Sequence, residues 1–260
     1  MPITLNGVNH PHYGYITITS QGDSSYTDVK RLVLKRKIQS EFAFTSVYTK
    51  SISNTTQLQF TYVDKYCRNN YTYQYKVVYL NADGNMVAEE TMNVESKFDV
   101  LVVCDGNAIW YSPLNISPIN FNTIKPYAVN QPIYSRKPSY YNVTAINYDE
   151  GTCTGTFLEM TGPENDITFE TEHNWKYRRS FKEFLTEGNA KIIKSVSGEM
   201  WMVGIKTDGI SDSSLFDRAE VDGARQIEFG WLEIGDVDSE SDLYENKFIN
   251  VPSDFWSSGV

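Results

Sequence analysis

Hydrophobic and polar positions alternate along the first part of the chain. Residues 57–63 (QLQFTYV) place Leu58, Phe60 and Tyr62 on one face, and residues 71–80 (YTYQYKVVYL) repeat the pattern. A period of two predicts strands, because successive side chains of a strand point to opposite faces. Further strands are expected at residues 13–19, 29–38, 42–48, 86–94 and 98–104, with a hairpin turn at Asp83-Gly84. About seven short strands with this spacing favour a β-sandwich.

A helical period appears later in the chain. Apolar residues recur at i, i+4, i+7 and i+8 in the set Tyr177, Phe181, Phe184 and Leu185. This stripe predicts an amphipathic helix over residues 175–187, which Gly188 ends in the left-handed conformation. Strands are expected around it at residues 143–148, 154–160, 190–195, 199–206 and 226–234, with turns at Asp149-Glu150-Gly151 and Ser197-Gly198. The second part therefore reads as a small α+β unit with one short helix.

A proline-rich connector separates the two parts. Residues 113–138 hold five of the nine prolines, and a proline lacks the donor that a central strand needs. Its apolar residues indicate a segment that lies extended on a surface and exchanges between subunits. The predicted division is a β-sandwich at 1–112, a connector at 113–138, an α+β domain at 139–236 and an acidic C-terminal extension at 237–260.

Composition narrows the class of protein. The chain is rich in aromatic residues, with 18 Tyr, 13 Phe and 5 Trp, which suits β-structure. No apolar run approaches the roughly 18 residues that span a bilayer. Three widely spaced cysteines (Cys67, Cys104 and Cys153) match neither a zinc site nor a disulfide scaffold, so buried free thiols are expected.

The charge is unevenly distributed. The net charge is −10, which argues against binding to nucleic acid. Residues 1–128 carry 11 Lys/Arg and 10 Asp/Glu, whereas residues 129–260 carry 12 and 23. Two interpretations stay open: solubility, or head-to-tail packing between the basic part of one copy and the acidic part of the next.

Few residues are arranged for chemistry. His10 and His12 could hold a metal, but the third histidine, His173, is distant and no Cys-x-x-Cys supports a site. Cys104 precedes Asp105-Gly106, which reads more simply as a turn than as a reactive thiol. Two carboxylate pairs, Asp149-Glu150 and Glu164/Asp166, are the loop candidates for glycoside hydrolysis. The same pairs also fit solvated loops.

Two surface features remain. The basic run of residues 30–37 alternates with apolar positions, which favours a lysine-protected edge strand over a phosphate site. Trp201 and Trp231 lie in apolar strands and are expected in the core. Other aromatic residues are candidates for stacking on sugars or for filling a partner's pockets: Trp110, Tyr111, Tyr140, Tyr141 and Trp256.

Several short blocks occur in a definite order along the chain. Residues 181–205 (FKEFLTEGNAKIIKSVSGEMWMVGI) contain a helix, Leu-Thr-x-Gly, a lysine-containing hairpin and Met-Trp-x-Val, and residues 229–236 (FGWLEIGD) supply a closing strand. Upstream, residues 94–106 (VESKFDVLVVCDG) are preceded by five further positions of the pattern: Asp64, Asn70, Tyr71, Tyr73 and Tyr75. This order of blocks resembles tail and baseplate structural proteins of bacteriophages infecting Firmicutes.

The resemblance implies a fibronectin-III-like or immunoglobulin-like sandwich and a virion component that is not an enzyme and needs no cofactor. Distal tail proteins, which form rings between the tail tube and the host-binding apparatus, are the nearest functional comparison. The expected partners are further copies in a symmetric homo-oligomer, other tail or baseplate proteins and, indirectly, a host surface glycan, but neither nucleic acid nor membrane. The N-terminus lacks a signal-peptide pattern, so synthesis in the host cytoplasm and a place in the virion are expected.

The expected mechanism is assembly through apolar contacts and added strands. The residues expected at the assembly interface are Lys30, Arg31, Lys35, Arg36, Pro113, Phe121, Pro126, Phe248, Phe255 and Trp256. Three alternatives stay open: a carbohydrate-binding module or receptor-binding protein, a glycan-cleaving enzyme, and a non-viral adhesin, which would need an export signal.

Overall fold

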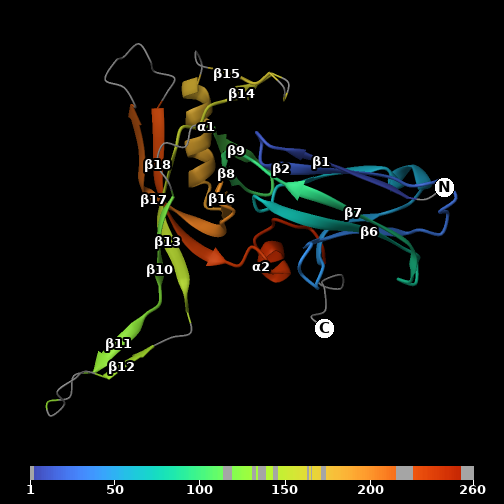
Figure 1. The fold of residues 1–260 in the computed structure, drawn as a ribbon, viewed down its shortest axis with the longest axis horizontal. Coiled ribbons are helices and arrows are strands. Elements are labelled where there is room, and N and C mark those ends of the chain that lie inside the picture. Colours follow the sequence, from blue (N-terminus) through green and yellow to red (C-terminus); the bar gives the residue numbers. More distant parts are fainter. Residues whose placement is uncertain are drawn as a thin grey trace.

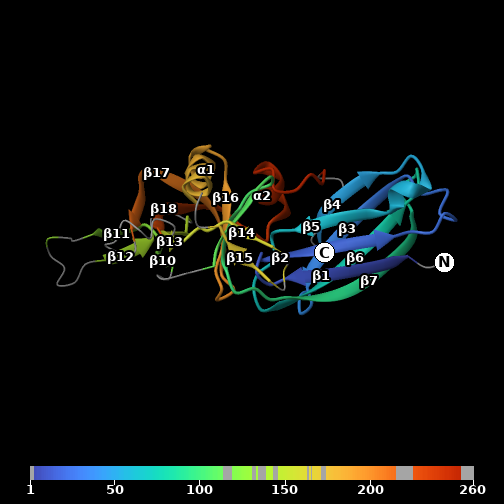
Figure 2. The same cartoon turned by 90° about the horizontal axis from the view of Figure 1, so that it is seen from above.

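The computed structural model describes residues 3–113, 119–130, 133, 139–142, 146–162, 164, 166–170, 174–214 and 225–252. The structure is 53% strand and 11% helix, so the protein is mainly β, with several antiparallel sheets. Figures 1 and 2 show two β-rich units next to each other, with the N-terminal strands in one and the longer helix in the other. Neither helix among the described residues is long and apolar enough to cross a membrane.

The first unit consists of two antiparallel sheets, one of order β1-β2-β5 and one of order β4-β3-β6-β7. The bounds are β1 Thr4–His10, β2 Tyr15–Gln21, β3 Arg31–Ile38, β4 Thr45–Ser51, β5 Phe60–Asp64, β6 Tyr71–Leu80 and β7 Met86–Ser96, with a 3-10 turn, η1, at Thr55–Leu58. Both sheets contribute to one core, in which Ile18 of β2 packs with Leu34 of β3 and Tyr75 of β6. The predicted turn at Asp83-Gly84 is confirmed, because Gly84 has φ 79° between β6 and β7.

The basic strand β3 is not an edge strand, and this prediction was wrong. It pairs with β4 on one side and with β6 on the other, so it is an inner strand. Its charges are accommodated on both faces of the sheet. Lys35 and Lys37 are half-buried on the outer face, whereas Arg36 points into the core and is 5% exposed.

A buried ion pair allows this inward arginine. Nη1 of Arg36 lies 2.6 Å from both carboxylate oxygens of Asp64, which also accepts hydrogen bonds from the Tyr75 hydroxyl at 2.7 Å and the Tyr66 amide at 2.9 Å. Burial would raise the pKa of Asp64, but the charge and hydrogen bonds of Arg36 outweigh it, and this pKa is lowered. Buried charges persist when they are paired and hydrogen-bonded, so this group ties β3, β5 and β6 together.

The second unit is built on a seven-stranded antiparallel sheet of order β10-β13-β18-β17-β16-β8-β9. The bounds are β8 Leu101–Cys104, β9 Ile109–Ser112, β10 Asn120–Ile124, β13 Tyr148–Gly155, β16 Lys191–Lys194, β17 Met200–Ser214 and β18 Arg225–Gly235. The strand expected at residues 98–104 was assigned to the sandwich, and this was wrong. It is β8, which pairs with β16 and places Val103 opposite Ile193.

A second correction concerns Asp149-Glu150-Gly151, expected as a turn between two strands. These residues lie inside β13, which pairs with β10 and β18. Glycine is needed at 151 because a Cβ there would lie 1.9 Å from the Asn120 carbonyl oxygen of β10. The expected strand at residues 143–148 falls partly outside the described residues. The hairpin at Ser197-Gly198 is confirmed between β16 and β17, with Gly198 at φ 98°.

The predicted helix is confirmed as α1, Asn174–Thr186. Its apolar stripe buries Phe181, Phe184 and Leu185 in a core shared with the seven-stranded sheet. Gly188 has φ 79°, as expected for the residue that ends the helix. Arg178 is also buried, with 5% of its surface exposed, and it lies 3.8 Å from Asp212 of β17.

The C-terminal segment packs against both units. It contains a second helix that was not predicted, α2 (Glu240–Glu245), which begins where the Ser239 side chain accepts a hydrogen bond from the Asp242 amide. Leu243 and Phe248 join a core with residues of β8, β16 and β17. An ion pair at 2.7 Å links Asp238 to Arg68 of the first unit. Figure 1 shows α2 at the junction of the two units.

The proline-rich connector contributes to a long projection. β10 is the outermost strand of its sheet, and it leads to a hairpin of β11 (Tyr127–Asn130) and β12 (Ser139–Asn142). Figure 1 shows this hairpin extending away from both units. A second short hairpin, β14 (Met160–Thr161) with β15 (Thr168–Phe169), lies near α1. The described residues of β10 to β13 are called the arm below.

Candidate assembly surface

The residues expected at an assembly interface come from three segments of the chain, and the structure does not bring them together. Lys30 is exposed and Arg31 and Lys35 are half-buried on the first unit. Arg36 belongs to the buried pair with Asp64, so it does not face a partner. The basic run therefore offers three of its four predicted residues to the surface.

The second group comes from the connector. Phe121 of β10 is 38% exposed, and its ring packs 5.1 Å from that of Trp201, while Pro126 is half-buried between β10 and β11. Pro113 is also half-buried but lies apart from them, because it follows β9 at the opposite edge of the sheet from β10. The third group consists of the aromatic residues near the C-terminus. Phe248 is 6% exposed and packs 5.5 Å from the Tyr66 ring of its own chain, so its placement is intramolecular. Phe255 and Trp256 lie outside the described residues.

The arm carries several exposed apolar side chains. Val129 of β11 is 45% exposed and Tyr127 is 61% exposed. Ile133 and Ile146 are 93% and 61% exposed. Four of the five residues of β10 are exposed, and among the described strands β10 pairs with β13 alone. Its other edge therefore presents backbone donors and acceptors to an incoming strand.

The histidine candidates are engaged in separate contacts. Nδ1 of His10 lies 3.1 Å from Glu164, and its Nε2 lies 2.9 Å from the Thr17 hydroxyl. His12 lies 3.2 Å from Asp99. Among the described residues, no group of three His, Cys, Asp or Glu side chains is placed to hold a metal ion.

The carboxylate candidates on β13 are also engaged. Asp149 accepts hydrogen bonds from Thr123 at 2.7 Å and from the Trp201 indole at 3.0 Å. Glu150 pairs with Lys206 at 2.6 Å. Both lie on strand β13, where they connect neighbouring strands of the sheet.

The aromatic candidates whose side chains the structure describes are buried or half-buried, whereas the side chains of Tyr140, Tyr141 and Trp256 lie outside that description. Trp201 and Trp231 are 5% and 0% exposed, which confirms their predicted place in the core. Trp110 is half-buried under α1, with its ring 4.6 Å from Tyr177. Tyr111 packs edge-on against Tyr13 at 5.3 Å.

The three thiols are free and buried, as predicted. Burial raises the pKa of Cys104 to about 12 and also raises the pKa of Cys153, so both stay protonated at neutral pH. Since the thiolate is the reactive form, we expect no thiol to react with Ellman's reagent in the folded protein at pH 8. All three thiols should react once guanidinium unfolds the chain. A thiol that reacts in the folded protein as fast as free cysteine would contradict this burial.

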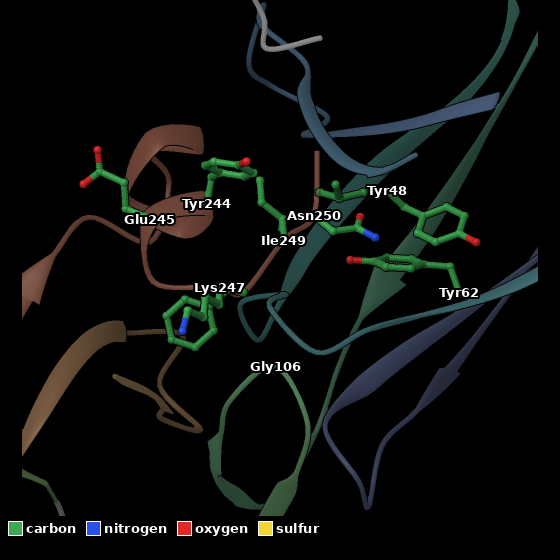
Figure 3. A pocket seen from close by; sticks show the side chains of 10 residues that line it. Tyr48, Tyr62, Gly106, Tyr244, Glu245, Lys247, Ile249 and Asn250 are labelled. Atoms are coloured by element: carbon green, nitrogen blue, oxygen red, sulfur yellow. The ribbon is translucent and has the colours of Figure 1, made fainter. Parts of the chain in front are cut away.

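A hollow at the junction of the two units was not predicted. It has a volume of about 750 Å³ and is named here the tyrosine cleft. Figure 3 shows Tyr48 and Tyr62 from the first unit on one side, with Tyr244 and Lys247 from the C-terminal segment across from them. The remaining lining residues are Val47, Gly106, Glu245, Phe248, Ile249 and Asn250.

Neither a protein-family model nor a curated protein matches the chain. Function is therefore inferred from the residues and their geometry.

Proposed function

We propose that this chain is a structural component of a bacteriophage tail or baseplate. Copies would associate into a ring or an adaptor that links the tail to the host-binding apparatus. The first unit is proposed to be a fibronectin-III-like or immunoglobulin-like sandwich, which is supported by two antiparallel sheets that share one core. The proposal assigns no enzymatic activity and no cofactor, and it places the protein in the virion after synthesis in the host cytoplasm.

The main observation that supports this proposal is the projecting arm. A two-stranded hairpin alone is marginally stable in water, so a projecting hairpin gains stability when it packs on another surface. The exposed side chain of Val129 and the exposed edge of β10 supply apolar area and backbone groups for such packing. A neighbouring copy is the partner that a structural protein always has available.

In a symmetric ring, a modest contact between neighbouring copies is enough to hold the assembly together. An arm that binds a different surface of the next copy makes a head-to-tail contact, which closes into a ring when the rotation allows it. Each copy in a ring contributes two such contacts, so the whole is tighter than any one of them. Residues 129–260 are acidic, whereas residues 1–128 are nearly neutral. This difference in charge is compatible with a head-to-tail contact between unlike surfaces. Other tail proteins are the further proposed partners.

Polar substitutions on the arm test the assembly. We expect Tyr127→Ser combined with Val129→Ser to shift the protein from oligomer to monomer in light scattering coupled to size-exclusion chromatography. The thermal midpoint of the monomer should hardly change, because the two side chains are 61% and 45% exposed.

The matched control is Met86→Ser combined with Val87→Ser on β7, where the exposed fractions are 60% and 42%. The control should leave the oligomer intact. If both pairs of substitutions change the oligomeric state equally, the arm is not the interface.

The proposal that the protein belongs to a virion is tested separately, by sequencing the genes that flank this one. A long, heptad-rich reading frame of tape-measure type is expected nearby, whereas flanks of carbohydrate-processing genes would contradict it.

A further inference from the structure

The tyrosine cleft has an aromatic wall on the first unit. The rings of Tyr48 and Tyr62 lie 5.4 Å apart and are inclined by 34°. Phe60 is 8% exposed and belongs to the core of the first unit, 5.6 Å from Tyr48 and inclined by 27°, so it packs against this pair without lining the cleft. The two tyrosine rings form an apolar surface with hydroxyl groups at its edge. Tyr244 of α2, which is 42% exposed, stands across the opening (Figure 3).

A second, more polar hollow of about 360 Å³ adjoins the tyrosine cleft. The two hollows share the lining residues Gly106, Glu245 and Lys247. A Cβ on Gly106 would lie 2.8 Å from the Lys247 carbonyl oxygen, so the two loops touch between the hollows. The polar hollow is lined by three asparagines: Asn107, Asn189 and Asn246. Two adjacent hollows, divided by this contact and together called the groove, thus offer an aromatic part and an amide part.

The charges of this groove are balanced. Asp105 also lines the polar hollow, but its carboxylate is held by Lys191 at 2.8 Å. Glu245 and Lys247 then contribute one charge of each sign. This balance favours an uncharged ligand over a nucleic acid or another polyanion, which needs a cluster of cations.

We propose that the tyrosine cleft and the adjoining amide hollow bind an uncharged oligosaccharide of hexopyranose units. The C–H face of a sugar ring packs on the tyrosines, and the hydroxyls of the next ring exchange hydrogen bonds with the side-chain amides of Asn107 and Asn189. The Asn246 amide already donates to the Asp242 carbonyl at 2.9 Å. The volume of the cleft falls within the roughly 300–1,000 Å³ of small-molecule sites. This site places glycan binding on the chain itself, and it does not depend on the proposed ring.

The test is calorimetric titration of the full chain with uncharged hexasaccharides of glucose, mannose, galactose and N-acetylglucosamine. At least one should bind with a millimolar or tighter Kd, and polygalacturonate should not compete. Tyr244→Ala should weaken that binding at least about tenfold, because the sugar loses one stacking surface. Tyr71→Ala is the matched control, with a side chain that is 41% exposed on β6, and it should leave the affinity unchanged.

The proposal is overturned when none of the four sugars binds or when both tyrosine variants have the same affinity. Loss of the oligomer in Tyr244→Ala without sugar binding would assign the cleft to a contact between copies and would equally overturn it. Thermal unfolding of both variants checks that they remain folded. Sugar binding by a strictly monomeric chain would contradict the proposed ring but support this site.

Discussion

Replacing Asp64 with asparagine should lower the free energy of unfolding by about 3–5 kcal/mol, the usual cost of breaking a buried ion pair. The variant keeps nearly the same shape but leaves the charge of Arg36 buried without its partner. Both side chains are almost fully buried, at 6% and 0% exposed, so water cannot replace the lost carboxylate. Urea unfolding followed by tryptophan fluorescence measures the change.

An exposed ion pair provides the comparison. Glu89 pairs with Lys76 at 3.1 Å on the surface of the same unit, where the carboxylate side chain is 42% exposed. Such pairs contribute about 0–1 kcal/mol, so Glu89→Gln should leave stability nearly unchanged. A loss in Asp64→Asn as small as that in Glu89→Gln would contradict the structural role given to the pair.

The same variant changes the response to acid. The folded-state pKa of Asp64 lies below its unfolded value because Arg36 outweighs the effect of burial. The stabilisation is therefore fully present above the unfolded value of about 3.9, and it is lost as the pH falls through the lower folded pKa. The difference in unfolding free energy between parent and Asp64→Asn should consequently shrink below about pH 4.

Phe248→Ala should destabilise the protein by about 3–5 kcal/mol, as expected when a buried phenylalanine leaves a cavity. Its ring fills the core between the units and contacts Tyr66, so the loss loosens the junction as well as the C-terminal segment. Denaturant unfolding measures the loss. Phe42→Ala removes the same atoms from a side chain that is 100% exposed, and it should change stability by less than about 0.5 kcal/mol. Similar losses in both variants would contradict this account of the junction.

This packing also determines which truncation can test assembly. A chain that ends at Gly235 loses Leu243, Phe248 and the rest of its C-terminal core residues, so a failure to assemble would reflect unfolding. A chain that ends at Pro252 keeps those residues and removes Phe255 and Trp256. The second truncation therefore separates the proposed contacts of the last residues from their effect on folding.

The periodicity of the sequence predicted where strands and helices occur better than it predicted which strands pair. The alternation in β6 and the stripe on α1 appear in the sequence because one face of each is buried and the other is not. β8 is buried along its whole length, so its four residues carry no alternation that could assign it to a sheet. The edge assignment of β3 failed because the carboxylate that neutralises Arg36 comes from β5.

The C-terminal segment and the cleft show the limits of local signals. α2 has six residues, too few for an apolar stripe, although Ser239 three residues before Asp242 is a recognisable start signal. The tyrosine cleft brings together β4, β5 and the segment after α2, which are far apart in the chain. The packing of Phe248 against Tyr66 and the ion pair of Asp238 with Arg68 hold these segments together, and no local pattern encodes either contact.

Negative-stain electron microscopy of the purified full chain tests the proposed assembly most directly. The account predicts closed rings of identical copies, with the arm of each copy on its neighbour, and the loss of these rings in Tyr127→Ser/Val129→Ser. Single copies at every protein concentration, in the parent chain as in the variant, would contradict it.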